Sequence, residues 1–440
     1  MRTHDTASLA RGPGFVALLV SLAGCLGLVL LWLKPDVRFL THLADDAFRY
    51  HAPTDNFIAL GQWTFDGVKP GTGLHVLWGY FLMLLLKLQP AFTPHTISVV
   101  GITVQSTSLA AASLLLARTG LRLFGRGAGW GVLAALSSTM LLQGGWLMEN
   151  AFAIFMAAVI VDHLGRERVS CSSRATFAFS AVIGWLLELA RSDAGLLAAF
   201  LLLMHCLLAR RRIVDQTMPA AALCVFAGAG AGGVTILLHT HAVLQASAQQ
   251  KLFWSGVESG GAFPAWAGPQ FSLHPWLQYV ALHFGGNERL LHLSSIAGHF
   301  LGLPFAACVL IGAFLMARQA GALARGLLAT FGLLAVSYCF LYKNADVSEW
   351  FVSSFAVTLA LAAAAAGAWF FPRIPIIAAS TVMVLAMVGS IRSLAPPHPR
   401  QPPCMYRDGV ALREGSLAEA TGTCLQQTSS FPIATLGLLK

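Results

Sequence analysis

The sequence predicts an all-α, polytopic membrane protein with about eleven transmembrane helices, and three observations indicate this class. Of the 440 residues, 56% are hydrophobic and only 11% are charged, and the mean hydropathy of +0.69 lies far above that of a soluble domain. Apolar runs of roughly 17 to 25 residues, long enough to cross about 30 Å of hydrocarbon as a helix, recur along the chain. The alternating pattern of a transmembrane barrel is absent, which leaves helices as the spanning elements.

The first apolar run, residues 15–33, is interpreted as a retained first span. Arg2 and Arg11 precede it, as basic residues precede the core of a signal peptide. However, no small-residue cleavage site precedes Lys34. We therefore expect this helix to remain in the mature protein.

The positions of the arginines set the predicted orientation, because short arginine-bearing loops face the cytoplasm. Five such loops are residues 118–126, 166–174, 210–212, 318–325 and the site of Arg373. Placing these loops and the N-terminus inside leaves the C-terminus outside. The spans predicted in this way are residues 15–33, 95–117, 127–143, 150–164, 175–190, 194–209, 218–239, 296–317, 327–342, 351–371 and 374–394. The net charge of +9 therefore reflects orientation rather than a nucleic-acid partner, since the basic residues are scattered between apolar runs.

One apolar run, residues 74–88, does not fit as a span. Counting it as one would invert every later loop, and it is short and carries Lys87 near its end. A helix lying in the membrane interface satisfies both facts. The first outer loop then covers residues 34–94, with a polar helix at 45–60 and a turn-rich stretch at 61–73 before the interfacial helix.

The remaining outer segments are a large loop at residues 240–295 and a tail at residues 395–440, which follows a membrane domain at residues 1–394. Cys404 and Cys424 both fall in this tail. Outside the cytoplasm they are either joined as a disulfide or present as two free thiols. No Cys/His spacing typical of a metal site occurs.

Two adjacent carboxylates, Asp45 and Asp46, stand in the first outer loop in the stretch "HLADDAFRYH". They are interpreted either as a helix N-cap, for which one aspartate suffices, or as a functional pair. Adjacent carboxylates repel each other unless a divalent cation, a basic partner or a shared proton compensates. Such a pair is typical of a hard-metal site or a general base.

Further charged residues are predicted at the same outer face. Glu149 in "GGWLMENAF" borders hydrocarbon, where a charge is costly unless it is used or paired. Arg191 in "LLELARSDAGLL" is either an anion-binding residue or the ion-pair partner of Glu188 three positions earlier. Lys251 and Lys343 are either single snorkelling side chains or part of a cavity for an anionic headgroup.

These stretches resemble the signature of a group of bacterial GT-C-type membrane glycosyltransferases. The first-loop motif is similar to "DDAFRY", "NFIALGQWTFDGV" and "GLHVLW" in this chain, and "LMENAF", "LARSDAGLL" and "LYKNADVSEWFVSSF" follow in the expected order. The chain departs from its relatives at "KPGTGLHVLW", which lacks their asparagines and the proline after the histidine. That departure bears on the preference for the sugar or the acceptor.

The resemblance implies an inverting glycosyltransferase in the cytoplasmic membrane. Its donor is a polyprenyl-phosphate-linked sugar, and its acceptor is a glycan, a lipid or a protein reached at the outer face. The resemblance implies Asp45 as the base that takes the acceptor proton, Asp46 as its partner or a metal ligand, and Glu149 as the second acidic residue, catalytic or metal-binding. Either a divalent cation, Mg²⁺ or Mn²⁺, or fixed basic side chains would stabilise the leaving lipid phosphate. The candidate substrate-binding residues are Arg49, His75, Arg191, Lys251 and Lys343.

Two alternatives remain. A transporter or flippase of a lipid-linked saccharide would bind the same headgroup without chemistry, although such proteins usually carry internal repeats, and none is found here. An assembly scaffold would have no site at all. No Walker motif or dinucleotide fingerprint occurs in the sequence, so no nucleotide cofactor is expected.

Overall fold

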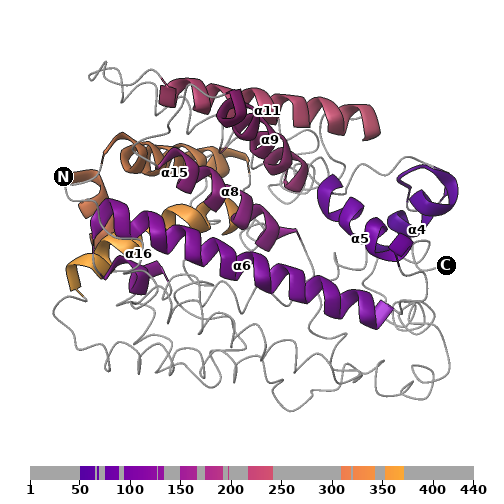
Figure 1. The fold of residues 1–440 in the computed structure, drawn as a ribbon, viewed down its shortest axis with the longest axis horizontal. Helices are drawn as coiled ribbons and strands as arrows, with labels where there is room; N and C mark the ends of the chain where they lie inside the picture. The colour runs from indigo at the N-terminus through magenta and orange to yellow at the C-terminus, as the bar shows by residue number, and fades with distance from the viewer. Residues whose placement is uncertain are drawn as a thin grey trace, which may run out of the picture.

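The computed structural model describes residues 50–64, 67–68, 75–88, 94–125, 127–132, 149–165, 174–191, 197, 217–240, 309–318, 321–341 and 352–370. Within these residues every regular element is a helix (Figure 1). The elements used below are α4 (His51–Leu60), α5 (Val76–Leu88), α6 (Pro94–Phe124), α8 (Asn150–Leu164), α9 (Arg174–Ala190), α11 (Thr217–Thr240), α15 (Ala322–Leu341) and α16 (Val352–Phe370). The predicted helical class is confirmed for this part of the chain.

Among the described residues, one helix is long and apolar enough to cross a membrane, at Ala220–His239 within α11. Shorter apolar helices include Asn150–Leu164 and Val76–Leu88. The full count of eleven spans stays a prediction, and the predicted spans at 15–33 and 374–394 lie outside the described residues.

Most described helices begin and end within a few residues of their predicted bounds, but α6 is longer than expected. Its predicted end lies just before Arg118, whereas the helix continues to Phe124 and is followed by Gly125 in the left-handed conformation (φ 92°). Arginine is a good helix former and is favoured near a helix C-terminus. The charges of this predicted loop therefore do not end the helix, and the glycine that permits a left-handed residue follows it.

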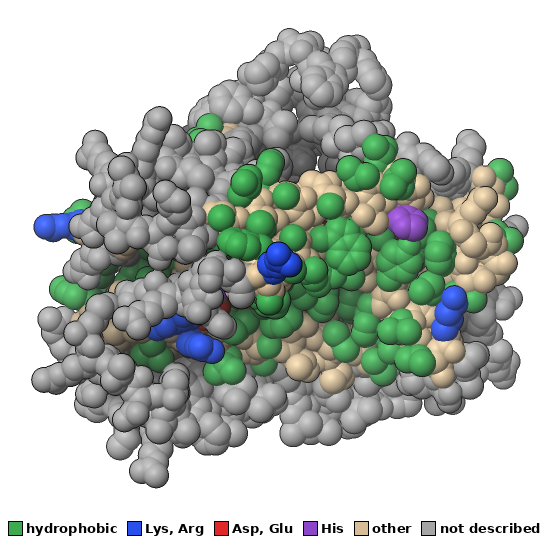
Figure 2. All heavy atoms as spheres, turned by 45° about the horizontal axis from the view of Figure 1, so that its top comes forward, with side chains coloured by type: hydrophobic (Ala, Val, Ile, Leu, Met, Phe, Trp, Pro, Cys, Tyr) green, Lys and Arg blue, Asp and Glu red, His purple; other side chains and the backbone are tan. Residues whose placement is uncertain are grey.

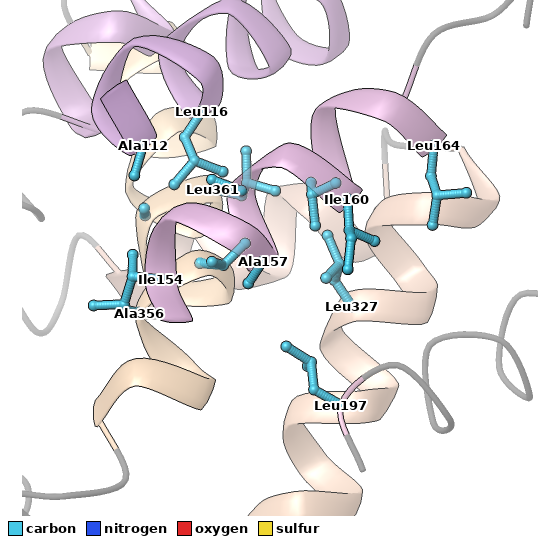
Figure 3. Close-up of a cluster of buried hydrophobic side chains, with 14 of the residues drawn as sticks. Ala112, Leu116, Ile154, Ala157, Ile160, Leu164, Leu197, Leu327, Ala356 and Leu361 are labelled. Carbon is cyan, nitrogen blue, oxygen red and sulfur yellow. The ribbon is translucent and has the colours of Figure 1, made fainter. Parts of the chain in front are cut away.

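The core is built on α8, which contacts α6, α9 and α16. Ile154 and Ala157 of α8 are almost fully buried, and they lie in one cluster with Leu116 of α6 and Leu361 of α16 (Figure 3). The alanine run 362–366 of α16 is entirely buried. Small residues let the backbones of these helices approach closely, which is how helices associate where no water is available to drive packing.

Helices α9 and α11 form the most extensive helix pair in the described residues. A Cβ atom at Gly184 of α9 would collide with the backbone of Val225, and one at Gly228 of α11 would collide with the backbone of Ala181. A Cβ atom at Gly232, four residues after Gly228, would lie 2.6 Å from the Cβ of Glu188. Glycine is therefore required on both helices, and the spacing of four on α11 is typical of close helix contacts in membranes.

A buried polar cluster lies at the C-terminal end of α8. Asp162 forms an ion pair with Arg122 of α6 and accepts a hydrogen bond of 3.0 Å from the hydroxyl of Thr119. The next residue, His163, contacts the hydroxyl of Ser180 on α9 at 2.9 Å. Arg122 belongs to the arginine-bearing stretch 118–126 predicted to be cytoplasmic, and a second polar cluster lies at the opposite end of the helix.

Candidate functional site

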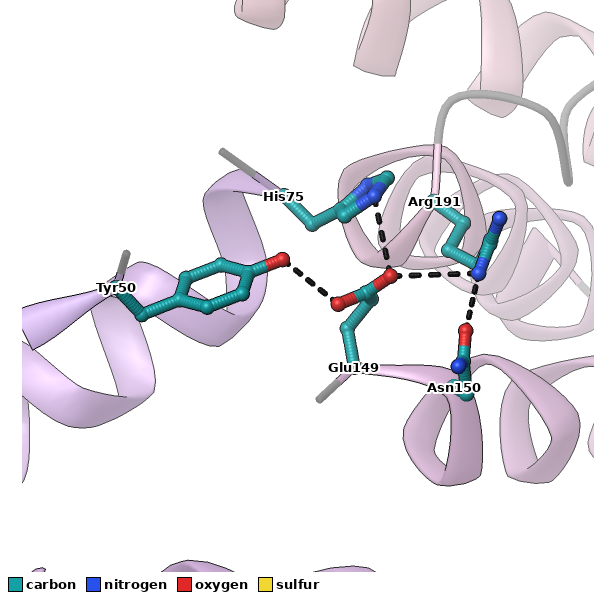
Figure 4. A network of polar contacts seen from close by, with 5 residues as sticks. All are labelled: Tyr50, His75, Glu149, Asn150 and Arg191. Atoms are coloured by element: carbon teal, nitrogen blue, oxygen red, sulfur yellow. Dashed lines mark hydrogen bonds and ion pairs between the residues drawn. The ribbon is translucent and has the colours of Figure 1, made fainter. Parts of the chain in front are cut away.

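The second polar cluster is centred on the carboxylate of Glu149, where the ends of several helices meet (Figure 4). Glu149 directly precedes α8, His75 directly precedes α5, and Arg191 directly follows α9. Tyr50, which directly precedes α4, reaches the cluster through its long side chain. Residues far apart in the sequence therefore surround one carboxyl group.

Both oxygens of the Glu149 carboxylate are engaged. The hydroxyl of Tyr50 donates a hydrogen bond of 2.7 Å to Oε2. His75 Nε2 lies 3.1 Å from Oε1, and Arg191 Nη1 lies 3.3 Å from the same oxygen. Arg191 Nη1 also donates to Oδ1 of Asn150.

The cluster is withdrawn from solvent. Glu149 and Asn150 are each 1% exposed, Tyr50 is 3% and Arg191 is 4% exposed, whereas the side chain of His75 is 14% exposed. Removing a carboxylate and a guanidinium from water costs on the order of several kcal/mol per ion. Only close, well-oriented hydrogen bonds offset this cost. Loss of any one donor should therefore have a large effect.

Local backbone structure fixes these side chains at the ends of their helices. The carbonyl of Tyr50 accepts hydrogen bonds from both the amide and the hydroxyl of Thr54, at 3.2 and 2.6 Å. The carbonyl of Glu149 accepts from the amide of Ala153 at 3.0 Å, while its side chain does not cap α8. Because its backbone joins the helix and its carboxylate does not, the carboxylate is available to the other segments.

A group of stacked aromatic rings connects α4 to α5. Phe57 of α4 stacks on Trp63 with ring centroids 4.5 Å apart, and Tyr80 of α5 meets Trp63 edge-on at 5.5 Å. Tyr80 also contacts the ring of His239 at the end of α11 at 5.8 Å between centroids. Such packing holds α4 against α5, and with it the position of Tyr50 relative to His75.

The structure brings together three of the residues predicted from the sequence, namely Glu149, His75 and Arg191. Glu188 was the ion-pair partner considered for Arg191 from its spacing, and the guanidinium pairs with Glu149, which directly precedes α8. The remaining predicted site residues, Asp45, Asp46, Arg49, Lys251 and Lys343, lie outside the described residues.

Two members of the cluster were not predicted, Tyr50 and Asn150. Each stands next to a predicted residue, Tyr50 after Arg49 in "DDAFRY" and Asn150 after Glu149 in "LMENAF". Neither carries a charge that would be costly beside hydrocarbon, so the cost argument that identified Glu149 does not detect them.

The cluster is a set of hydrogen-bond donors around one carboxylate. Two donors contact Oε1 of Glu149 and one contacts Oε2, out of the roughly four lone-pair positions that a carboxylate offers. Among the described residues, no group of three or more histidines, cysteines or acidic residues is placed to hold a metal. As placed, the carboxylate is suited to fixing the segments that carry Tyr50, His75 and Arg191.

Compared with known protein families and with curated protein sequences, the chain matches none. The resemblance to GT-C glycosyltransferases is therefore an expectation from the motifs quoted above.

Proposed function

We propose that the protein is a polytopic GT-C-type glycosyltransferase, which transfers a sugar from a polyprenyl-phosphate donor to an acceptor at the outer face of the cytoplasmic membrane. The observation that carries the proposal is the hydrogen bond between Tyr50 and Glu149. Tyr50 ends the first motif and Glu149 belongs to the second, while Arg191 of the third motif binds the same carboxylate. If these motifs were unrelated helix caps, nothing would require them to meet.

The short stretch of chain before Tyr50 also limits how far the acidic pair, Asp45 and Asp46, can lie from it. Four peptide units separate Asp46 from Tyr50, so their Cα atoms lie within ~14 Å of each other in any conformation of the chain. This proximity in the chain to Tyr50 is the ground for proposing that the acidic pair and the cluster serve one site for a sugar joined to a phosphate.

The described surface supports a membrane location. Figure 2 shows the face formed by α11 and α9, where hydrophobic side chains predominate and basic ones are few. Large apolar side chains exposed on these two helices are Phe179, Val182, Leu223, Phe226, Val234, Leu237 and Leu238. A contiguous apolar surface of this kind is unusual on a soluble monomer and is ordinary for a surface that meets lipid.

The proposed topology has eleven spans with the N-terminus inside and the C-terminus outside, and the polar clusters at the two ends of α8 agree with it for this one helix. Glu149 and Asp162 are separated by ~20 Å of helix. Residues predicted outside gather around Glu149, and Arg122, predicted inside, lies at Asp162. A helix that crosses the membrane has one end at each face, so residues from opposite predicted sides would gather at its two ends.

In the proposed reaction the acceptor hydroxyl oxygen attacks the anomeric carbon of the donor, and the bond from that carbon to the lipid phosphate oxygen breaks. Asp45 takes the proton of the hydroxyl, and the electron pair leaves with the lipid phosphate. Cationic side chains, with Arg49, His75, Arg191, Lys251 and Lys343 as candidates, stabilise the charge on the phosphate. Asp46 orients Asp45 or, with Glu149, would hold a divalent cation, Mg²⁺ or Mn²⁺, which would supply charge stabilisation at the leaving phosphate. Glu149 holds the segments in place.

The proposal is tested by complementation of a strain that lacks the gene, followed by profiling of its envelope glycans. Wild type, Asp45→Asn and Glu149→Gln are compared, with Asp162→Asn as the matched control, because Asp162 is also a buried carboxylate on α8. We expect Asp45→Asn and Glu149→Gln to lose the glycan while they accumulate in the membrane, and Asp162→Asn to retain it. Full restoration by Asp45→Asn would falsify the mechanism.

The transporter alternative is separated by a chemical readout. Purified protein is incubated with a polyprenyl-phosphate-linked sugar and an acceptor extract, and the release of free polyprenyl phosphate is measured. A transferase releases the lipid phosphate and depends on Asp45. A transporter moves the intact lipid-linked saccharide across a vesicle membrane and releases none.

A further inference from the structure

The amide of Asn150 is a buried hydrogen-bond donor that the described residues leave unsatisfied. Its oxygen accepts from Arg191, whereas its nitrogen, Nδ2, has no hydrogen-bond partner among them. The residue is 1% exposed. Buried polar groups in native proteins are nearly always paired, and the few exceptions often occur where a ligand binds.

The surroundings of Asn150 favour an anionic oxygen as the missing acceptor. Asn150 is the first residue of α8, a helix of 15 residues whose first-turn amides have no acceptor within the helix. The carboxylate of Glu149 does not cap these amides, because it is engaged by Tyr50, His75 and Arg191. The N-terminal end of a helix that is not capped attracts an anion.

Among the described residues, the net charge around the amide of Asn150 is also zero or positive. The negative charge of Glu149 is offset by the adjacent Arg191. Among the described helices, α5 and α8 begin at the cluster and α9 ends there. A helix start carries about half a positive charge, so the first turn of α8 favours an anion beside Asn150.

We propose that Nδ2 of Asn150 donates a hydrogen bond to a phosphate oxygen of the lipid donor. This inference rests on the proposed function and adds a residue of the binding site for the donor phosphate. Arg191 holds the amide in place through the Asn150 oxygen, so that the nitrogen is presented to the ligand. Asn150 is thus a residue that selects an anionic lipid over its uncharged alcohol.

The test measures binding of farnesyl phosphate to the purified full-length protein in detergent, with farnesol and inorganic phosphate as comparison ligands. The key variant is Asn150→Asp. It keeps an oxygen for Arg191 and suits a helix start, so a purely structural role for the amide predicts unchanged binding. A ligand-binding role predicts that the Kd for farnesyl phosphate rises about tenfold or more, since a donor is replaced by a negative charge.

A second variant, Asn150→Ala, removes the donor without adding a charge and is also expected to raise this Kd about tenfold. Asp162→Asn is the control for a change at a buried polar position. Farnesol binding should be the same in all variants, and thermal melting confirms that each protein is folded. Together these variants separate the loss of a donor from electrostatic repulsion and from misfolding.

The outcomes distinguish the two proposals. If wild type does not bind farnesyl phosphate, the proposed donor class is wrong and the role of Asn150 is wrong with it. If wild type binds and both Asn150 variants bind with the same Kd, the donor class stands and the role of Asn150 is overturned. If inorganic phosphate competes as well as farnesyl phosphate does, the site takes free phosphate, and its assignment to the lipid donor is overturned.

Discussion

Replacing Tyr50 by phenylalanine tests the contact on which the proposed function rests. The change removes one hydroxyl and keeps the ring, so the packing of the side chain is retained. The lost bond, 2.7 Å long, joins a residue that is 3% exposed to a carboxylate that is 1% exposed. Water cannot replace the donor at such a site without opening the cluster.

The expected loss follows from the charge on the acceptor. A hydrogen bond to a charged group contributes about 1.5–3 kcal/mol to stability, roughly twice the value for a neutral pair. We therefore expect Tyr50→Phe to lower the free energy of unfolding by about 1.5–3 kcal/mol in wild type. In a Glu149→Gln background, where the acceptor is a neutral amide oxygen, the same change should cost about half as much.

The measurement is unfolding of the detergent-solubilised protein in increasing fractions of sodium dodecyl sulfate, followed by near-ultraviolet circular dichroism. Tyr80→Phe is the matched control, because its hydroxyl lies 3.3 Å from His239 Nε2 in an exposed position. We expect that control to cost less than about 1 kcal/mol. Equal losses for Tyr50→Phe in the wild-type and Glu149→Gln backgrounds would show that Tyr50 and Glu149 act independently, and the reasoning would be refuted.

Two further predictions concern the helix pair and a surface acid. Gly184→Ala and Gly228→Ala should reduce the yield of folded protein in size-exclusion chromatography, because each new methyl group meets backbone. Gly230→Ala, at an open position, should leave the yield unchanged. Equal yields for all three variants would contradict the close packing of α9 and α11. The pKa of Asp55 is raised above its ordinary value of 3.8 by burial, so its contribution to stability is present below about pH 3.8 and is lost as the pH rises through the folded pKa. Asp55→Asn should therefore raise the melting temperature slightly at pH 7 and not at acidic pH, and a larger gain at acidic pH would reverse the sign of this argument.

The bounds of the helices were largely predictable because the length of an apolar run is set by physics that acts locally. Residues 150–164 were predicted as a helix, and α8 spans Asn150–Leu164. The end of α6 was predicted seven residues too early, because arginines were taken to mark a loop. The orientation rule concerns which side of the membrane a charge occupies, and it does not determine where a helix ends.

The candidate site was predictable in part. Glu149 and Arg191 were identified because charges beside hydrocarbon are costly unless paired, and the structure pairs them with each other. Tyr50 carries no such cost, and its partner is 99 residues away. Which distant segments meet depends on tertiary packing, such as the alanine and glycine contacts of α16 and α11, and no local pattern in the sequence encodes it.

The burial of Glu149 bears on how the proposed reaction divides its work among the acidic residues. A general base must come within about 3 Å of the proton that it removes. Glu149 is 1% exposed, and both its oxygens accept hydrogen bonds from residues that hold it in place. An acceptor hydroxyl would have to enter this buried cluster to reach it. In the proposed reaction the base is therefore expected in the acidic pair of the first loop, and Glu149 is expected to hold Tyr50, and with it the end of that loop, beside His75 and Arg191.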